Sequence, residues 1–259
     1  MVVFSWIKPG NVKKDVSGSF EIGRVILMGK NELKKRKKRN DLLKSAYELF
    51  TTVGFSKTTI DNIAAKADVG KGTFYLYFKD KGEIREQLIV NQSAILLNKA
   101  AQALKKEQKE RAQNGDPSMD IADKIIFVTD YVINYLSKNI ALLKFISKNL
   151  SWGMLVKSTT AAKDNEEVQS FQQFLMEEFD KEEIVVREPL LLIFTILEMI
   201  NSTCYNIILK GEPVTFSEYK PYLYDTIRTL IDHAIIDPDS EEAESQKKFI
   251  TEYMNNQNM

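Results

Sequence analysis

TTIDNIAAKADVGKGTFYLYFKDKGEI, residues 58–84, contains two short apolar runs at helical spacing, separated by a tight turn at 68–70. The first helix is expected to begin at Thr58 or Thr59. Thr58 fits a capping box with Asp61, three residues later, and Thr59 is an equally good cap. Two short helices joined by such a turn are typical of a helix-turn-helix unit.

The second helix of the pair is expected over residues 71–78, with Phe74 and Phe78 four positions apart on its inner face. Asp80 follows and is expected to cap another helix, which runs from residue 81 to about residue 111. The chain then breaks at Asn-Gly-Asp-Pro, residues 114–117. The sequence therefore predicts a compact helical unit followed by one long helix.

The segment before the pair is strongly basic. Residues 34–39 are all Lys or Arg, and they lead into an amphipathic helix that ends at Gly54, with apolar positions at Leu42, Ala46, Leu49, Phe50 and Val53. Residues 31–85 hold 13 basic and 7 acidic side chains, a net charge of +6, in a chain with 36 of each sign. Residues 237–259 hold 2 basic and 6 acidic side chains, a net charge of −4. One basic end usually faces a polyanion, so the run at 34–39 is interpreted as adding phosphate or minor-groove contacts rather than as a solvated helix start.

The outer side of the second short helix has the chemistry of a DNA reader. Lys71 and Lys81 provide charges for phosphates, and Gly72 lets the backbone approach the duplex closely. Hydroxyl groups for further contacts come from Thr58, Thr59, Thr73, Tyr75 and Tyr77. The tyrosines are alternatively core residues, but two tyrosines and two phenylalanines cannot all face inward on one short helix. The DNA interpretation is therefore favoured.

This stretch resembles the DNA-binding domain of the TetR family of regulators over about residues 36–85, and its KGTFYLYFKDK portion is highly specific. Two positions depart from the family pattern: Gly70 stands where many members carry Ser, and Gly82 where many carry Glu. The resemblance implies a C-terminal domain that dimerises and binds an inducer. It also implies DNA contacts by Thr59, Gly70, Lys71, Gly72, Thr73, Tyr75, Tyr77 and Lys81.

The rest of the chain shows helical periodicity, so the fold class is expected to be all-α. A three-helix helix-turn-helix DNA-binding domain at 31–80 is joined by a long helix to a larger ligand-binding and dimerisation domain at 81–259. Two apolar helices are expected at 187–210 and 216–236, with apolar residues on more than one face. We expect these two helices to form a homodimer interface; the alternative is that they are fully buried within one large domain.

The binding site for a small-molecule effector is expected among apolar residues of the C-terminal domain. Glu198, on an otherwise apolar helix, is a candidate partner for a cationic ligand, although an exposed glutamate or one paired with a nearby Lys fits equally. Aromatic residues at helical spacing are usually core, so the pocket remains one interpretation of two. The candidate aromatic residues are Phe127, Tyr131, Trp152, Phe171 and Phe174. Residues 151–164 are expected to be irregular, and helical spacing returns over 168–179.

Composition argues against several classes of protein. One His and one Cys cannot supply a structural zinc site or most nucleophilic mechanisms, and no phosphate-binding or nucleophile-elbow motif is present. We therefore expect no metal, no cofactor and no enzymatic activity. Cys204 has no partner for a disulfide within the chain, which fits a reducing compartment. No stretch is expected to be apolar enough to cross a bilayer, so the protein is predicted to be cytoplasmic, with no membrane partner.

Residues 1–30 show neither helical periodicity nor a strand pattern, and we expect disorder there. A second hypothesis is that translation begins at Met28, because Gly23-Arg24 can be encoded by a purine-rich, ribosome-binding-like sequence three codons upstream. The mass of the natively expressed protein distinguishes the two hypotheses.

Together these features predict a sequence-specific regulator of transcription: a ligand-responsive repressor that binds a palindromic operator in double-stranded DNA as a homodimer. The alternative is a DNA-binding protein of the same fold with a non-transcriptional role, in nucleoid organisation or in binding another partner.

Overall fold

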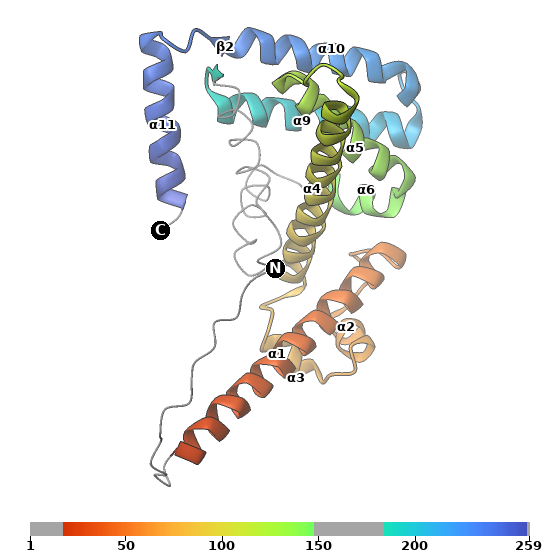
Figure 1. The fold of residues 1–259 in the computed structure, drawn as a ribbon. Helices are drawn as coiled ribbons and strands as arrows, with labels where there is room; N and C mark the ends of the chain where they lie inside the picture. The colour runs from red at the N-terminus through yellow and green to blue at the C-terminus, as the bar shows by residue number, and fades with distance from the viewer. Residues whose placement is uncertain (1–17, 148–183, 258–259) are drawn as a thin grey trace.

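The computed structural model describes residues 18–147 and 184–257, and within these ranges the chain is almost entirely helical (Figure 1). The expected all-α class is confirmed. The elements in chain order are α1 (Gly18–Thr52), α2 (Ile60–Lys66), α3 (Lys71–Tyr75), α4 (Lys81–Asn114), α5 (Ile121–Lys138), α6 (Ile140–Ser147), β1 (Val185–Val186), α9 (Pro189–Lys210), α10 (Phe216–Ala234), β2 (Ile235–Ile236) and α11 (Glu241–Gln257).

Helix α1 is longer than expected and corrects the prediction of disorder over residues 1–30. It begins at Gly18, so residues 18–30 are helical, whereas residues 1–17 lie outside the described part. The physical reason is cooperativity. Once the amphipathic segment from Leu42 onward has formed a helix, each added residue gains one hydrogen bond without a new nucleation step. A segment without its own amphipathic pattern can therefore extend a helix that the core has already started.

Helices α1, α2 and α3 pack together at one end of the molecule (Figure 1). Their shared core also takes side chains from the start of α4 and from α6. The buried members of this cluster are Leu42, Leu43, Ala46, Phe50, Ile63, Phe74, Phe78, Ile84, Leu88, Ile89, Leu142, Phe145 and Ile146. Phe145 is the central contact from α6, because its ring lies 5.6 Å from that of Tyr47 and 6.2 Å from that of Phe50. The N-terminal unit is thus fixed to the rest of the chain through α6 as well as through α4.

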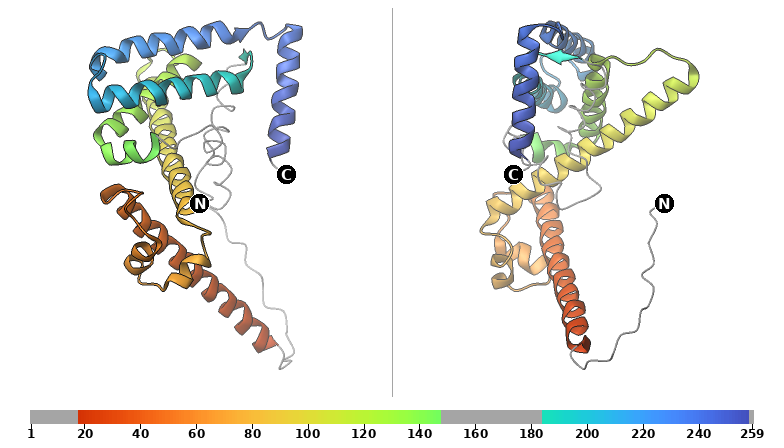
Figure 2. Two further views of the ribbon diagram at one scale, coloured as in Figure 1. Left: turned by 180° about the vertical axis from the view of Figure 1, so that it is seen from behind. Right: turned by 60° about the vertical axis from the view of Figure 1, so that its left-hand side comes forward.

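Helix α4 runs from the N-terminal unit to the opposite end of the molecule (Figure 2). The Asp80 side chain caps its start by accepting a hydrogen bond of 2.9 Å from the Glu83 backbone N–H, as the sequence predicts. Its end is closed by Gly115, which adopts a left-handed conformation with φ of 74°. The helix therefore spans the expected length, ending three residues later than predicted at Asn114.

The opposite end is formed by α5, α9 and α10, which share a second apolar cluster. Helix α9 buries Ile193, Ile196, Cys204 and Ile207, and α10 buries Leu223, Ile227 and Ile231. One prediction is wrong here. Among the described helices, α9 is long and apolar enough to cross a bilayer by length and composition alone, with a mean hydropathy of 1.5 over its most apolar window. Its contacts with α10 and α6 place it in the helical layer of this end.

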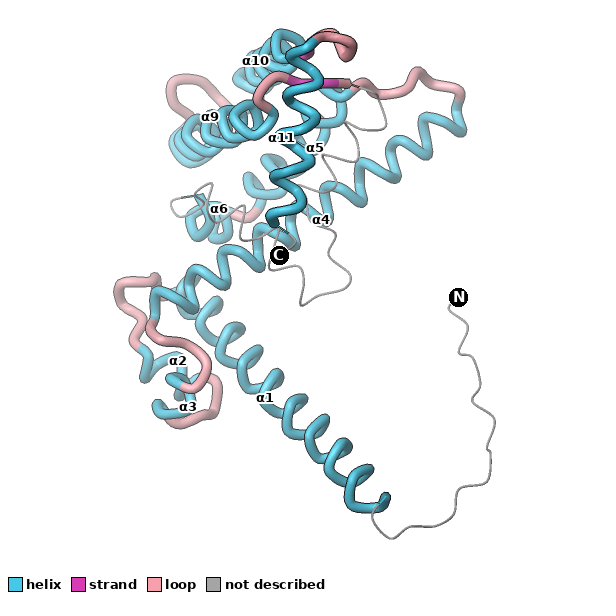
Figure 3. Tube along the Cα trace, turned by 90° about the vertical axis from the view of Figure 1, so that its left-hand side faces the viewer, coloured by secondary structure: helices cyan, strands magenta, loops and turns pink. Residues whose placement is uncertain are grey.

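The C-terminal segment contains a short pair of strands and one further helix. Helix α10 ends at Ala234, and the next two residues form β2, which pairs antiparallel with β1 in the register Val185↔Ile236 and Val186↔Ile235. Helix α11 begins at Glu241 and stands beside the main helical layer (Figure 3). An ion pair between Arg187 and Glu242 links it to the segment after β1. The helix expected over 168–179 and the irregular segment expected over 151–164 lie outside the described residues.

Candidate nucleic-acid interface

The turn between α2 and α3 has the geometry of a Schellman motif. The Val69 N–H donates to the carbonyl of Ala64 at 3.0 Å, and the Asp68 N–H donates to that of Ala65 at 3.2 Å. Asp68 is the left-handed residue of this motif, with φ of 54°. Because a short polar side chain tolerates this conformation better than a branched one, an aspartate can stand here in place of glycine.

Thr59 begins α2. Its Oγ1 accepts a hydrogen bond of 3.1 Å from the Asn62 N–H, and the Asn62 Oδ1 accepts one of 3.0 Å from the Thr59 N–H. This is a capping box with Asn62 in place of the expected acidic partner. Of the two caps considered from the sequence, Thr59 is therefore the one used. Thr58 is buried, and its hydroxyl donates to the carbonyl of Gly54 at 2.8 Å.

Helix α3 has one inner and one outer side. Phe74 is fully buried, and Phe78, just past the helix end, packs against it with 5.7 Å between the ring centroids. Tyr75 faces outward with 51% of its surface exposed, whereas Tyr77 is half-buried against the N-terminal core. The helix itself ends at Tyr75, three residues earlier than predicted, although the Phe78 N–H still donates to the Phe74 carbonyl at 3.0 Å.

The start of α3 is open to solvent. Lys71 and Gly72 are exposed, Thr73 is half-buried, and a Cβ built at Gly70 or at Gly72 would meet no atom within 4 Å. The Lys71 ammonium lies 3.0 Å from the Asp61 carboxylate, and this hydrogen bond together with the charge of Asp61 raises the pKa of Lys71. The pair is exposed, so a phosphate can replace Asp61 at little cost.

Lys81 has a more internal position than the sequence suggests. Its ammonium donates to the carbonyls of Phe55 at 2.7 Å and Thr58 at 2.8 Å, and it lies 4.3 Å from the centre of the Phe55 ring. The Arg85 guanidinium lies 4.2 Å from the same ring. Lys81 therefore ties the loop between α1 and α2 to the start of α4, a role that its place in the sequence does not reveal.

Leu76 is the residue of this surface that sequence reasoning missed. It follows Tyr75 directly and is 78% exposed, the highest value among the exposed large apolar side chains of the described residues. The signal was present in the pattern: Phe74 and Phe78 define the inner side of the helix, so the position midway between them must face outward. A search for polar groups alone gives no reason to single out an apolar residue at this position.

Comparison with known proteins agrees with this geometry. The model of bacterial regulatory proteins of the tetR family matches residues 42–88, which contain the end of α1, α2, α3 and the start of α4. Residues 42–88 are thus a DNA-binding domain of the TetR family of transcription regulators.

The curated relatives of this chain are described as regulators or repressors of transcription. The uncharacterized HTH-type transcriptional regulator YhgD of Bacillus subtilis (strain 168) is 24% identical over 131 residues, 50% of this chain and 62% of the relative. The probable acrEF/envCD operon repressor of Escherichia coli (strain K12) is 27% identical over 110 residues, 42% of this chain and 47% of the relative. The matches therefore span less than two thirds of the length of these relatives.

Similar solved structures include the repressor SmeT of the Stenotrophomonas maltophilia multidrug efflux pump SmeDEF. That structure has a TM-score of 0.48 and 16% identity, and the alignment covers 77% of this chain and 91% of that one. A putative tetR family transcription regulator from Shewanella sp. PV-4 also has a TM-score of 0.48 and 16% identity, with 77% of this chain and 99% of that one covered.

The candidate effector residues fall partly within the described structure. Phe127 and Tyr131 on α5 are half-buried and pack against the second apolar cluster, and Glu198 on α9 is half-buried. Trp152, Phe171 and Phe174 lie outside the described residues. Phe127 and Tyr131 thus belong to the same helical layer as α9.

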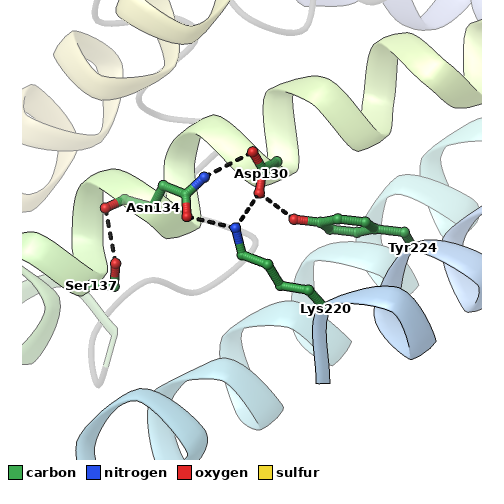
Figure 4. A network of polar contacts seen from close by, with 5 residues as sticks. All are labelled: Asp130, Asn134, Ser137, Lys220 and Tyr224. Atoms are coloured by element: carbon green, nitrogen blue, oxygen red, sulfur yellow. Dashed lines mark hydrogen bonds and ion pairs between the residues drawn. The ribbon is translucent and has the colours of Figure 1, made fainter. Parts of the chain in front are cut away.

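A polar network joins α5 to α10 (Figure 4). The Lys220 ammonium lies 2.6 Å from both the Asp130 carboxylate and the Asn134 side-chain oxygen, and the Tyr224 hydroxyl donates to Asp130. Burial by itself raises the pKa of Asp130, but the hydrogen bonds from Lys220 and Tyr224 and the lysine charge outweigh burial, so the pKa is lowered. Burial and the same contact raise the pKa of Tyr224. Asp130 is therefore a charged brace between two helices.

Cys204 and the acidic residues show no metal-site geometry. Within residues 18–147 and 184–257, no group of three or more His, Cys, Asp and Glu side chains is placed to hold a metal ion. Cys204 is buried in α9, and burial raises the pKa of its thiol to about 11. A thiol that is protonated and shielded from solvent is a poor nucleophile, so Cys204 acts as a small apolar residue of the core.

Proposed function

We propose that this chain is a ligand-responsive repressor that acts in the cytoplasm as a homodimer on a palindromic operator, with α3 in the major groove. One observation carries the proposal. Phe74 on α3 and Phe78 just past its end are buried, while Lys71, Tyr75 and Leu76 are exposed to solvent. A rigid helix with an exposed cationic, hydroxyl and apolar surface matches the phosphates, base edges and thymine methyl groups of the groove.

We assign different roles to the residues of this surface. Thr59, Lys71 and Tyr75 are exposed and are proposed to contact phosphates, and Leu76 is proposed to contact a thymine methyl group. Gly70, Gly72, Thr73 and Tyr77 are proposed to lie against the duplex with α3. For Thr58 and Lys81 we propose a supporting role, because their polar groups are already bonded within the protein.

Dimerisation is proposed to occur through α9 and α10. Leu191 on α9 is 60% exposed, Phe194 lies one turn away on the same side, and Tyr222 on α10 is 68% exposed. Large apolar side chains that are exposed on an apolar helix favour burial against another protein surface. A two-fold contact through these helices supplies that cover and places two copies of α3 on one face of the operator.

The effector is proposed to bind between α5 and α9, near Phe127, Tyr131 and Glu198. Its binding is proposed to reach the DNA-binding domain through α4 and α6, because Phe145 of α6 packs on Tyr47 and Phe50 of α1. A shift of α6 would then alter the separation of the two reading helices, so that both no longer fit one operator.

Selection from a random duplex pool, followed by mobility-shift measurements on the enriched sequence, tests the proposal. Lys71→Ala and Tyr75→Ala are expected to weaken operator binding at least tenfold while leaving the dimer intact. Lys106→Ala, an exposed lysine far along α4, serves as the matched control. Unchanged binding by both α3 variants contradicts the proposal. A pool with no enriched sequence favours the alternative, a non-transcriptional DNA-binding role.

A further inference from the structure

The basic run at residues 34–39, here called the basic segment, lies on α1 outside the N-terminal core. Residues 34–38 are exposed and Arg39 is half-buried, whereas from residue 31 onward the first fully buried side chain of α1 is Leu42. Within the described part of the chain, no ion pair involves the basic segment. Because successive residues turn by about 100° along a helix, six consecutive cations cover every side of it. The segment is therefore a rod of positive charge without an acidic partner among the described residues.

The basic segment begins close to α3. The Arg39 guanidinium lies 5.4 Å from the centre of the Phe78 ring, which packs on Phe74 of α3. From Arg39 to Lys34 the axis of α1 rises about 7.5 Å, a length over which each DNA strand carries about two phosphates. In Figures 2 and 3 the N-terminal part of α1 extends beyond α2 and α3. The positive charge of the basic segment thus extends outward from the edge of the helix-turn-helix unit.

Repulsion between the like charges of the basic segment destabilises this part of α1, and a bound polyanion would offset that repulsion. Lys34 and Lys38, like Lys35 and Arg39, are like charges one helical turn apart, a spacing that destabilises a helix. A membrane surface is a poorer partner, because basic helices bind membranes with one apolar face, and six cations in succession provide none. Double-stranded DNA next to α3 supplies negative charge along the helix axis without requiring such a face.

We propose that the basic segment is a second DNA-contacting element, which binds the phosphates that flank the site read by α3 without reading their sequence. The inference rests on the proposed function, since α3 in the groove is what brings the segment to the duplex. It predicts a longer contact than the helix-turn-helix alone provides. It also predicts that the segment contributes equally to operator and random DNA, because phosphates carry no sequence information.

In the test variant, Lys34, Lys35, Lys37 and Lys38 are all changed to Gln. The control variant has the same net charge, but its four substitutions are at exposed lysines distant from α3: Lys105→Gln, Lys106→Gln, Lys109→Gln and Lys210→Gln. Affinity is measured against NaCl concentration on a duplex of random sequence and on the selected operator. The basic-segment variant is expected to bind both duplexes at least tenfold more weakly. Its log–log salt slope should be reduced by about 0.9 for each phosphate that the protein no longer neutralises. The ratio of the two affinities should not change.

Two further measurements complete the test. Changing the same four lysines to Arg keeps the charge and should retain the salt slope, and the thermal midpoint of the Gln variant should match that of the wild type. An unchanged salt slope for the Gln variant, when the wild type prefers one sequence, overturns the inference and leaves the proposed function standing. Loss of binding to anionic phosphatidylglycerol vesicles with unchanged DNA affinity also overturns it. Failure of the α3 variants to weaken binding instead counts against the proposed function.

Discussion

At the level of single residues, the proposed DNA-contacting surface of α3 includes one position without a side chain, Gly72. Gly72 has an ordinary helical backbone and nothing within 4 Å of a built Cβ, so neither strain nor crowding within the protein requires glycine there. Close approach by the duplex, as proposed for α3, would account for a residue without a side chain here.

Gly72→Ala and Gly72→Val are therefore expected to fold as well as the wild type, since both residues have a higher helix propensity than glycine. Operator affinity should fall with side-chain size, by about tenfold or more for Val, which corresponds to about 1.4 kcal/mol. Mobility-shift titration checks the affinity and thermal unfolding checks the fold. Equal affinity across the three proteins would show that DNA does not approach this position.

Asp68 permits a test of the turn itself. A β-branched residue at its left-handed φ of 54° is strained, so Asp68→Val should destabilise the chain by about 1–2 kcal/mol. Asp68→Gly removes the same carboxylate without strain and should unfold at a urea concentration close to that of the wild type. If both variants had the same reduced stability, the carboxylate rather than the backbone conformation would be what matters.

The sequence predicted the residues of this site unevenly. Phe74, Phe78 and Tyr75 were placed on the correct sides of α3, because local periodicity alone determines which side a helical residue faces. The internal bonds of Lys81 were not predicted, because its acceptors belong to residues 23 and 26 positions earlier, and only the folded loop brings them near.

At the scale of elements, boundaries set by local chemistry were predicted well and boundaries set by tertiary context were not. Asp80 and Gly115 carry signals for the start and end of α4, and the helix was expected over nearly its full length. The start of α1 has no such signal, and it lies at Gly18 because the helix propagates from its folded C-terminal half. Pairing of β1 with β2 joins segments about fifty residues apart, which periodicity cannot reveal.

The brace between α5 and α10 makes a prediction about pH. The pKa of Asp130 is lowered in the folded chain, so its contribution to stability is present above the ordinary aspartate value of 3.8 and is lost as pH falls through the folded value. The urea midpoint of the wild type should therefore drop between about pH 6 and pH 3. The drop should be smaller for Asp130→Asn, which has no charge to lose. Asp225→Asn, on the exposed side of α10, is the matched control and should keep the full drop.

At the level of the whole molecule, helix α9 is strongly apolar but is only partly buried within a single chain. Its length and composition would allow it to span a membrane, yet only 28% of its most apolar 18-residue stretch is buried within the protomer. Its inner residues pack against α10 and α6, while Leu191 remains exposed. A second copy related by two-fold symmetry, as proposed above, would cover the exposed side of α9 with the equivalent surface of an identical helix.

Leu191→Glu places a charge at the centre of this proposed contact without disturbing the protomer, because the side chain is 60% exposed. The variant is expected to sediment as a monomer and to lose operator affinity, since two linked reading helices bind one palindrome far more tightly than one. Its affinity for a half-site should change little. Ile95→Glu makes the same substitution at an exposed position of α4 and should remain dimeric. A Leu191→Glu protein that still sediments as a dimer would place the interface elsewhere, and the cover of α9 would then have to come from a different partner.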